Sequence, residues 1–223
     1  MSLSESPSPL RLLADVFASP AGAPFALAGG YALQAHGLLE RPHANLDLAT
    51  ASPEPLRRLA WEVGAALTAL GHEVGVEGTT PLTAHLTVGA VPLTLHRENL
   101  WAPPVPTPYG PCLALPDAVG TKMRALYGRG LAVDLVDARA AAERFGLPEL
   151  EELGRRHLRD GDGDLDPTVL QGRLTGTDHY PDAAFTAHGL AESDIAALRA
   201  WAQAWSTDIA ERLLEDGASP DDC

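Results

Sequence analysis

Two polar residues separated by one position are the first place where this sequence could do chemistry. Asn45 and Asp47 belong to the segment NLDLA, in which polar and apolar residues alternate. Because side chains two apart share one face of a β-strand, Asn45 and Asp47 are expected to lie side by side. Two acids at this spacing can bridge two Mg²⁺ ions that orient a triphosphate. In this chain one of the pair is an amide, so any Mg²⁺ site here would be weaker than one built from two acids.

A pair of glycines lies upstream of this segment. Gly29 and Gly30 separate the apolar run 25–28, which reads as a short buried strand, from the helix-like run 31–36. Glycines at such a turn let backbone N–H groups approach a phosphate, and the start of a helix adds partial positive charge. Most glycine pairs are plain turns, so the pair is weak evidence by itself. We take Gly29, Gly30 and the adjacent Tyr31 as candidate ligand-binding residues.

The overall charge limits which partners the chain can hold. The 223 residues carry a formal net charge of −14. Broad binding to nucleic acid needs a surplus of Lys and Arg on one face, so extensive DNA binding is not expected and a large RNA interface is disfavoured. Any phosphate must instead meet a few local cations, for which Arg41, Lys122 and Arg129 are the candidates.

Three histidines fall near the same part of the sequence. His36, His43 and His96 could supply a general base or replace missing metal ligands. Their spacings match no standard zinc arrangement, so each is more often a structural or exposed histidine than part of one shared site. His96 is the catalytic candidate among them, because a two-residue shift in the alignment described below would place it at a metal-binding position.

The apolar periodicity predicts a mixed sheet flanked by helices rather than regular βαβ repetition. Gly89-Ala90 predicts a hairpin between the last two strands, and the proline-rich stretch 101–111 is expected to run over the surface. Helices are expected at 10–17, 31–36, 53–70, 117–127, 134–145 and 192–214, with all of the chain after 147 helical. The helix at 192–214 places its apolar residues on one stripe, which is expected to pack into a core. Strands are expected at 25–28, 46–49, 73–76, 84–88 and 91–95.

Four segments follow from this pattern. They are an N-terminal segment with a short helix at 1–20, an α/β core at 21–145, a helical C-terminal lobe at 146–215 and a disordered tail at 216–223. Cys112 and Cys223 form no disulfide framework, and neither a basic-then-apolar leader nor a membrane-length apolar run is present. We therefore expect a cytoplasmic location and no membrane partner.

Several of these motifs together resemble a known family. AGGYALQAHG followed by RPHANLDLAT is similar to the GG opening and the Arg-to-DxD stretch of AbiEii-type nucleotidyltransferases. GPCLALPDAVGTKMRALYGRGLAVDLVDARAA resembles the same family's helix with a Lys, followed by an Arg and two aspartates three apart. FTAHGLAESDIAALRAWAQAWSTDI resembles the helical tail of its actinobacterial members, so the likeness covers most of 25–210. It implies an α/β nucleotidyltransferase-like fold with a helical C-terminal lobe.

The resemblance also implies an activity. Members transfer NMP from an NTP to tRNA ends or, in relatives, to protein hydroxyls, often as the toxin of a toxin–antitoxin pair. An NTP or other small-molecule ligand, a tRNA and an antitoxin protein are thus the expected partners, and Mg²⁺ the expected cofactor. Carried over to this chain, Gly29 and Gly30 form a phosphate cradle and Lys122 contacts the triphosphate. Asp134 and Asp137 are supporting acids.

The chain departs from the family where the metal should bind. The resemblance leaves Asp47 as the surviving metal ligand and catalytic carboxylate of a weak Mg²⁺ site. Asn45 stands in place of the first catalytic Asp, Thr94 in place of the third carboxylate, and Val133 where an Arg usually precedes Asp134. An amide brings no charge to Mg²⁺ and a hydroxyl is weaker still. Three interpretations stay open: a nucleotidyltransferase with weakened or altered metal dependence, a non-catalytic ligand-binding pseudoenzyme, and a metal-independent enzyme of specialised metabolism that uses Asp47 and a nearby His.

Overall fold

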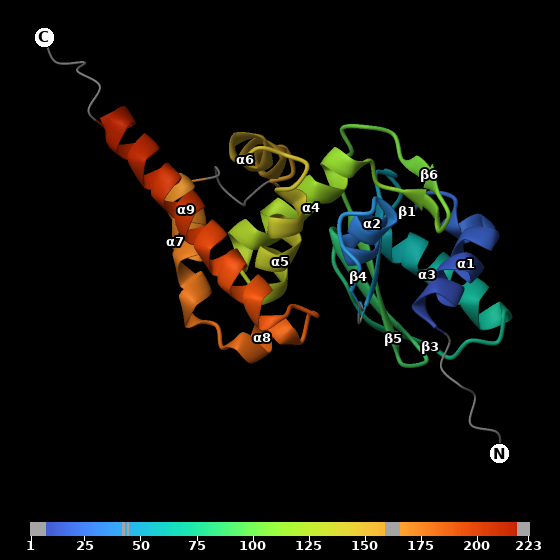
Figure 1. Ribbon diagram of the computed structural model, residues 1–223. Coiled ribbons are helices and arrows are strands. Elements are labelled where there is room, and N and C mark those ends of the chain that lie inside the picture. The colour runs from blue at the N-terminus through green and yellow to red at the C-terminus, as the bar shows by residue number, and fades with distance from the viewer. Residues whose placement is uncertain (1–7, 42, 44, 159–165, 218–223) are drawn as a thin grey trace, which may run out of the picture. The chain divides into compact units, whose positions relative to one another are not determined.

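A mixed seven-stranded sheet organises the first half of the chain (Figure 1). The computed structural model describes residues 8–41, 43, 45–158 and 166–217. The strand order is β3-β4-β5-β2-β1-β7-β6, and parallel and antiparallel pairings both occur. The strands are β1 (Ala26–Ala28), β2 (Leu46–Thr50), β3 (Val74–Thr79), β4 (Thr83–Val88), β5 (Val91–Arg97), β6 (Val105–Thr107) and β7 (Gly110–Cys112). The mixed sheet confirms the predicted α/β class.

The chain divides into two units, which we describe separately. The first contains residues up to 37 and 43–118, and the second contains 38–42 and the chain from 119 onward. The division falls within α4, whereas the sequence analysis placed the end of the core at 145. Residues 132–141 join the second unit because they pack on the C-terminal helices. Of the predicted tail, 218–223 lie outside the described residues, and 216 and 217 still belong to the last helix.

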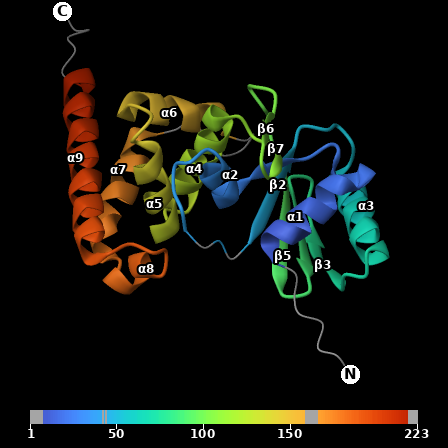
Figure 2. The same ribbon diagram turned by 45° about the vertical axis from the view of Figure 1, so that its right-hand side comes forward.

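Helices cover the apolar face of the sheet in the first unit. Its helical elements are α1 (Pro9–Ala18), η1 (Pro20–Gly22), α2 (Gly29–Ala35) and α3 (Leu56–Ala69). Helix α3 packs on β3, β4 and β5, and α1 packs on α3; Figure 2 shows α3 along the strands with α1 beside it. Leu48, Leu93 and Leu86 are buried on this face. Alternation then turns the residues between them to the other face, where Asp47, Thr94 and His85 lie.

Strand register brings distant residues into one row. Strands β4 and β5 form the predicted hairpin, with Gly89 in its turn at φ +58°. Strand β2 pairs parallel with β5, so that Asp47 lies opposite Thr94, and Thr94 in turn lies opposite His85 of β4. Strand β1 pairs antiparallel with β2 and sets Ala28 beside Asp47. Four strands therefore deliver neighbouring side chains to the same region.

The proline-rich stretch 101–111 departs from the prediction. It contains β6 and β7, which pair with each other, and β7 pairs parallel with β1. Pro106 lies in β6 at the edge of the sheet, where a residue without an N–H can be accommodated. The prolines of this stretch indicate a loop, so these two short strands were not predicted from the sequence.

Helices make up the second unit. They are α4 (Leu115–Gly128), which begins in the first unit, α5 (Ala132–Ala141), α6 (Leu147–Arg156), α7 (Pro167–Thr175), η2 (Gly176–His179), α8 (Asp182–Thr186) and α9 (Glu192–Gly217). Helix α9 packs on α5, α7 and α8. Trp205 of α9 is fully buried, and its indole N–H donates to Glu151 at 3.0 Å. The predicted apolar stripe of α9 thus packs into a core, as expected.

In the described part of the chain, no helix combines the length and the apolar character that crossing a membrane would require.

We predict that the start of α4 is held by one buried carboxylate. The side chain of Asp117 accepts backbone N–H groups from Trp101 and Ala102 at 3.0–3.2 Å and is almost fully buried. Asp117→Ala leaves these donors without their acceptor and should lower the free energy of unfolding by about 2 kcal/mol. Urea denaturation followed by circular dichroism measures this change. Asp178→Ala, at an exposed site, is the control; an equal loss in both variants would contradict the prediction.

Candidate functional site

Five polar side chains gather on the exposed face of the sheet, and we name them the strand-face cluster. The members are Asn45, Asp47, His85, Thr94 and His96. The Oδ1 atom of Asp47 lies 3.1 Å from Nε2 of His96, and its Oδ2 accepts a hydrogen bond from Nδ2 of Asn45 at 2.8 Å. The Asp47 side chain is 15% exposed and that of His96 26% exposed. The central carboxylate is thus half-sheltered and hydrogen-bonded at both oxygens.

Two of these contacts test the spacing argument directly. Asn45 and Asp47 lie side by side, as their separation by one position predicts. His96 reaches the same carboxylate because β5 runs parallel to β2 and His96 follows the residue paired with Asp47 by two positions. His36 and His43 are not members of this cluster: the His36 ring contacts the backbone oxygen of Leu113 at 2.8 Å, and His43 lies against Gly30.

Sequence reasoning did not single out His85. Its Nδ1 lies 3.4 Å from the Thr94 hydroxyl, directly across the β4–β5 hairpin. The alternating segment TAHLTV at 83–88 and the short Gly89-Ala90 turn could have identified it. Counting outward from the turn pairs position 85 with position 94, because a two-residue loop fixes the register.

The glycine pair provides room for the side chains of the site. Gly29 has φ +64°, and a Cβ there would lie 2.2 Å from Oδ2 of Asp47. A Cβ on Gly30 would lie 2.2 Å from Nδ1 of His43, whose ring centroid is 4.6 Å from that of Tyr31. Burial, with a smaller effect of Tyr109, raises the pKa of the Tyr31 hydroxyl. Both glycines therefore allow polar side chains to approach the backbone at the start of α2.

The predicted cations lie in the second unit. Arg41 Nη2 and Lys122 Nζ each contact Asp137, at 2.7 and 2.8 Å. The Asp137 side chain is fully buried, while those of Arg41 and Lys122 are 8% and 12% exposed. Burial alone would raise the pKa of Asp137, but the charges and hydrogen bonds of Lys122 and Arg41 outweigh it and hold that pKa below its ordinary value. One buried carboxylate thus forms ion pairs with two cations.

Arg129 has a different setting from the other two cations. Its Nε and Nη2 atoms donate to the two oxygens of Asp134 at 2.8 and 2.7 Å. The same carboxylate accepts the backbone N–H of Leu131 at the start of α5. This geometry holds the α4–α5 turn together. Nucleotide contacts by Arg41, Lys122 and Arg129 stay predictions.

The donor set on the sheet does not fit a two-Mg²⁺ centre. Within the described residues, no group of three or more His, Cys, Asp or Glu side chains is arranged to hold a metal ion. Asn45 presents an N–H to Asp47, and His96 presents a ring nitrogen. Mg²⁺ prefers several oxygen ligands in an octahedral arrangement. Asp47 is the carboxylate of the strand-face cluster, and both of its oxygens are already engaged.

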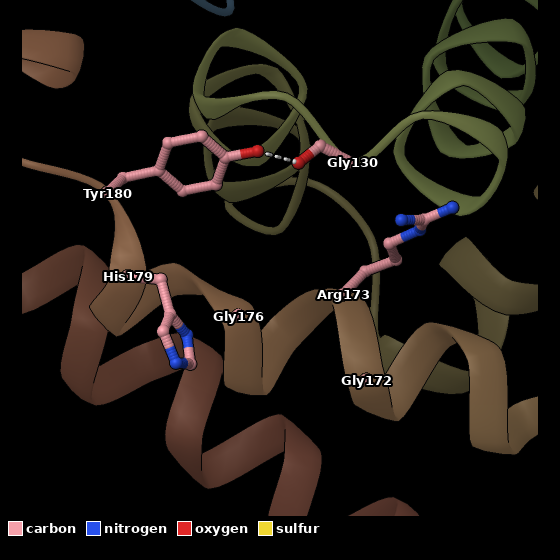
Figure 3. A pocket seen from close by; sticks show the side chains of 6 residues that line it. All are labelled: Gly130, Gly172, Arg173, Gly176, His179 and Tyr180. Carbon is pink, nitrogen blue, oxygen red and sulfur yellow. Dashed lines mark hydrogen bonds between the residues drawn. The ribbon is translucent and has the colours of Figure 1, made fainter.

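A cavity of about 290 Å³ lies within the second unit (Figure 3). The Tyr180 hydroxyl at its wall donates to the backbone oxygen of Gly130 at 2.7 Å. Arg173 donates to the backbone oxygens of Tyr127 and Gly128 at 3.1 and 2.7 Å. These bonds satisfy carbonyls at the end of α4, which helices leave without intrahelical partners. The polar lining therefore has a structural explanation.

We predict that Gly29 is required by its closeness to Asp47 as well as by its backbone conformation. A left-handed conformation costs an alanine about 1–2 kcal/mol, and the added Cβ must also displace the Asp47 carboxylate. Gly29→Ala should therefore lose more stability in urea denaturation than Gly37→Ala. Gly37 is the matched control, since it has φ +69° but no atom within 4 Å of an added Cβ. Equal losses would show that the Asp47 contact contributes nothing.

We predict that Asp137 stabilises the second unit through its negative charge. Asp137→Asn leaves two buried cations without their shared anion and should cost about 3–5 kcal/mol at pH 7. Because the folded-state pKa is lowered, the stabilisation is complete above the ordinary Asp pKa of about 3.9 and disappears as pH falls through the folded value. Urea denaturation at pH 7 and pH 3 should show the two proteins converging at low pH.

The control for this measurement is Glu152→Gln. Glu152 also contacts two cations, Arg155 and Arg156, but on an exposed helix surface. Its replacement should change stability little at either pH, because water and salt screen exposed ion pairs. A loss at pH 7 as small for Asp137→Asn as for Glu152→Gln would contradict a role for the buried charge.

Comparison with known proteins identifies the fold. No family model matches the sequence, and no curated protein matches it. JHP933 from Helicobacter pylori matches with a TM-score of 0.52 at 15% identity, over 94% of each chain. The antibiotic-resistance factor ANT(2'')-Ia matches with a TM-score of 0.50 at 16% identity, over 76% of this chain and 95% of that one.

A third solved structure is that of MenT4, a nucleotidyltransferase toxin from Mycobacterium tuberculosis H37Rv. It matches with a TM-score of 0.49 at 16% identity, over 91% of this chain and 90% of that one. At these identities the comparisons concern the fold alone, and the two matches with the higher TM-scores support its assignment. Together with the mixed sheet and its flanking helices, they confirm the prediction made from the sequence: this chain has the nucleotidyltransferase fold.

Proposed function

We propose that the chain binds a nucleoside triphosphate at the strand-face cluster and that its transfer of NMP to an RNA or protein acceptor is weakened. The nucleotidyltransferase fold supports the general reaction. The resemblance to AbiEii-type toxins supports the acceptor classes, with tRNA and an antitoxin protein as the partners. A net charge of −14 makes a tRNA acceptor depend on few cations.

The observation that carries this proposal is the environment of the Asp47 carboxylate. Two-metal transfer needs several acids to hold ions that neutralise the phosphates and activate the attacking oxygen. Here Asn45 and Thr94 occupy positions assigned to acids by the resemblance, and Asp47 is hydrogen-bonded to Asn45 and His96 instead. Mg²⁺ affinity should therefore be low, and transfer slow.

The chain's own residues can still supply part of the chemistry. When His96 donates through Nε2 to Asp47, its Nδ1 becomes a proton acceptor. His96 can thus take a proton from an acceptor hydroxyl, and Asp47 positions it.

The same contact favours a second candidate function. A paired carboxylate and imidazole are sufficient for metal-independent acid–base chemistry on a small molecule of specialised metabolism. NTP binding separates the candidates, since this enzyme would bind no NTP with or without Mg²⁺. A pseudoenzyme would bind the nucleotide without Mg²⁺ and transfer nothing.

We predict that restoring the acids increases transfer. Asn45→Asp with Thr94→Asp adds two carboxylates beside Asp47 and should raise Mg²⁺-dependent transfer by at least about tenfold, because metal binding then neutralises the triphosphate. Incubation of α-labelled NTPs with tRNA and with cell protein, followed by gel analysis, measures transfer. Calorimetric titration with each NTP, in Mg²⁺ and in EDTA, measures binding.

The control is Thr87→Asp alone, without Asn45→Asp or Thr94→Asp. Thr87 lies on the same face of β4 but pairs with Pro92, away from Asp47. It should leave transfer at the level of the natural chain. Transfer by the natural chain that equals that of the restored double variant, or a failure to bind any NTP in either buffer, would overturn the proposed function.

A further inference from the structure

His85 projects from the row of residues where the resembling family has acids. It lies opposite Thr94, which lies opposite Asp47, so that three adjacent strands contribute one residue each. Neighbouring strands are about 4.8 Å apart, which places the His85 backbone about 10 Å from that of Asp47. That span matches a chain of phosphates rather than a single ion. His85 is exposed, so its ring is accessible to a ligand.

The contact with Thr94 determines what His85 offers. When the Thr94 hydroxyl donates to Nδ1 of His85, the ring carries its proton on Nε2. That N–H is at the far end of the ring from Thr94. In this tautomer His85 presents a hydrogen-bond donor from a face where the resembling family has a carboxylate at the position of Thr94.

The hydrogen bonds around Asp47 also affect which kind of ligand the strand-face cluster can hold. Asp47 is its carboxylate, and N–H groups of Asn45 and His96 hydrogen-bond to both oxygens. These charge-assisted bonds occupy acceptor sites on both oxygens that a cation would otherwise use. With a hydroxyl and two imidazoles beside it, the face has fewer anionic ligands for a cation than three acids would provide, and the donor that remains for an anionic oxygen is the His85 ring.

We propose that His85, with its ring oriented by Thr94, binds phosphate oxygens of the nucleotide directly, so that the strand-face cluster holds a phosphate chain without Mg²⁺. This assignment rests on the proposed function and adds how its ligand is held. His85 is a ligand-binding residue, and Thr94 positions its ring. The ligand class is a polyphosphate, either free or attached to a nucleoside.

The test uses inorganic triphosphate and ATP with the full chain in EDTA. Calorimetry should detect triphosphate binding by the natural chain, about tenfold weaker binding by His85→Ala, and no measurable binding by His85→Glu, which replaces the donor with an anion. Thr94→Val should show an intermediate loss because the ring is no longer oriented. His179→Ala, at an exposed histidine of the second unit, should bind as the natural chain does.

The result that would overturn the assignment is triphosphate binding by His85→Ala equal to that of the natural chain, at an unchanged melting temperature. Binding that requires Mg²⁺ would overturn it as well, and in that case NTP binding would leave the proposed function in place. Conversely, His85-dependent binding of triphosphate with no binding of any NTP would support the phosphate site while contradicting the proposed nucleotide function.

Discussion

The site depends on the contact between the Asp47 carboxylate and a backbone that has no side chain beneath it. Gly29 at φ +64° leaves the space that Oδ2 of Asp47 occupies. From that position the carboxylate meets the Asn45 amide on one side and the His96 ring on the other. A glycine expected to cradle a phosphate therefore also accommodates the protein's own acid. Any ligand that binds there must share the space at the start of α2 with Asp47.

Charge is balanced differently in the two units. On the sheet, one carboxylate is matched by neutral or titratable donors, which lets the side chains remain partly exposed. In the second unit, buried Asp137 is matched by two permanent cations, and it stays ionised despite its burial. The first arrangement can change its partners when a ligand arrives. Breaking the second arrangement would cost more free energy, because it would separate a buried carboxylate from the two cations that pair with it.

Local pattern was enough to predict most elements and the closeness of Asn45 to Asp47. Alternation around Asp47, the Gly89-Ala90 turn and the apolar stripe of α9 were read correctly, because each depends on residues close in sequence. Strands β6 and β7 were missed, since their prolines indicate a loop and their pairing with β1 is non-local. The Lys122 and Arg41 contacts with Asp137 were missed for the same reason: 96 positions separate Arg41 from its partner.

His85 is a member of the candidate site that local sequence pattern does not identify. Nothing in its immediate sequence distinguishes it from other exposed strand residues, and it is 38 positions from Asp47 along the chain. It joins the cluster only through two successive registers, β4 with β5 and β5 with β2. The first follows from a short turn and can be counted; the second is a parallel pairing set by tertiary packing. The residue types at positions 45 and 94 can be read directly from the sequence, whereas the side chains that surround them become visible only after the sheet has formed.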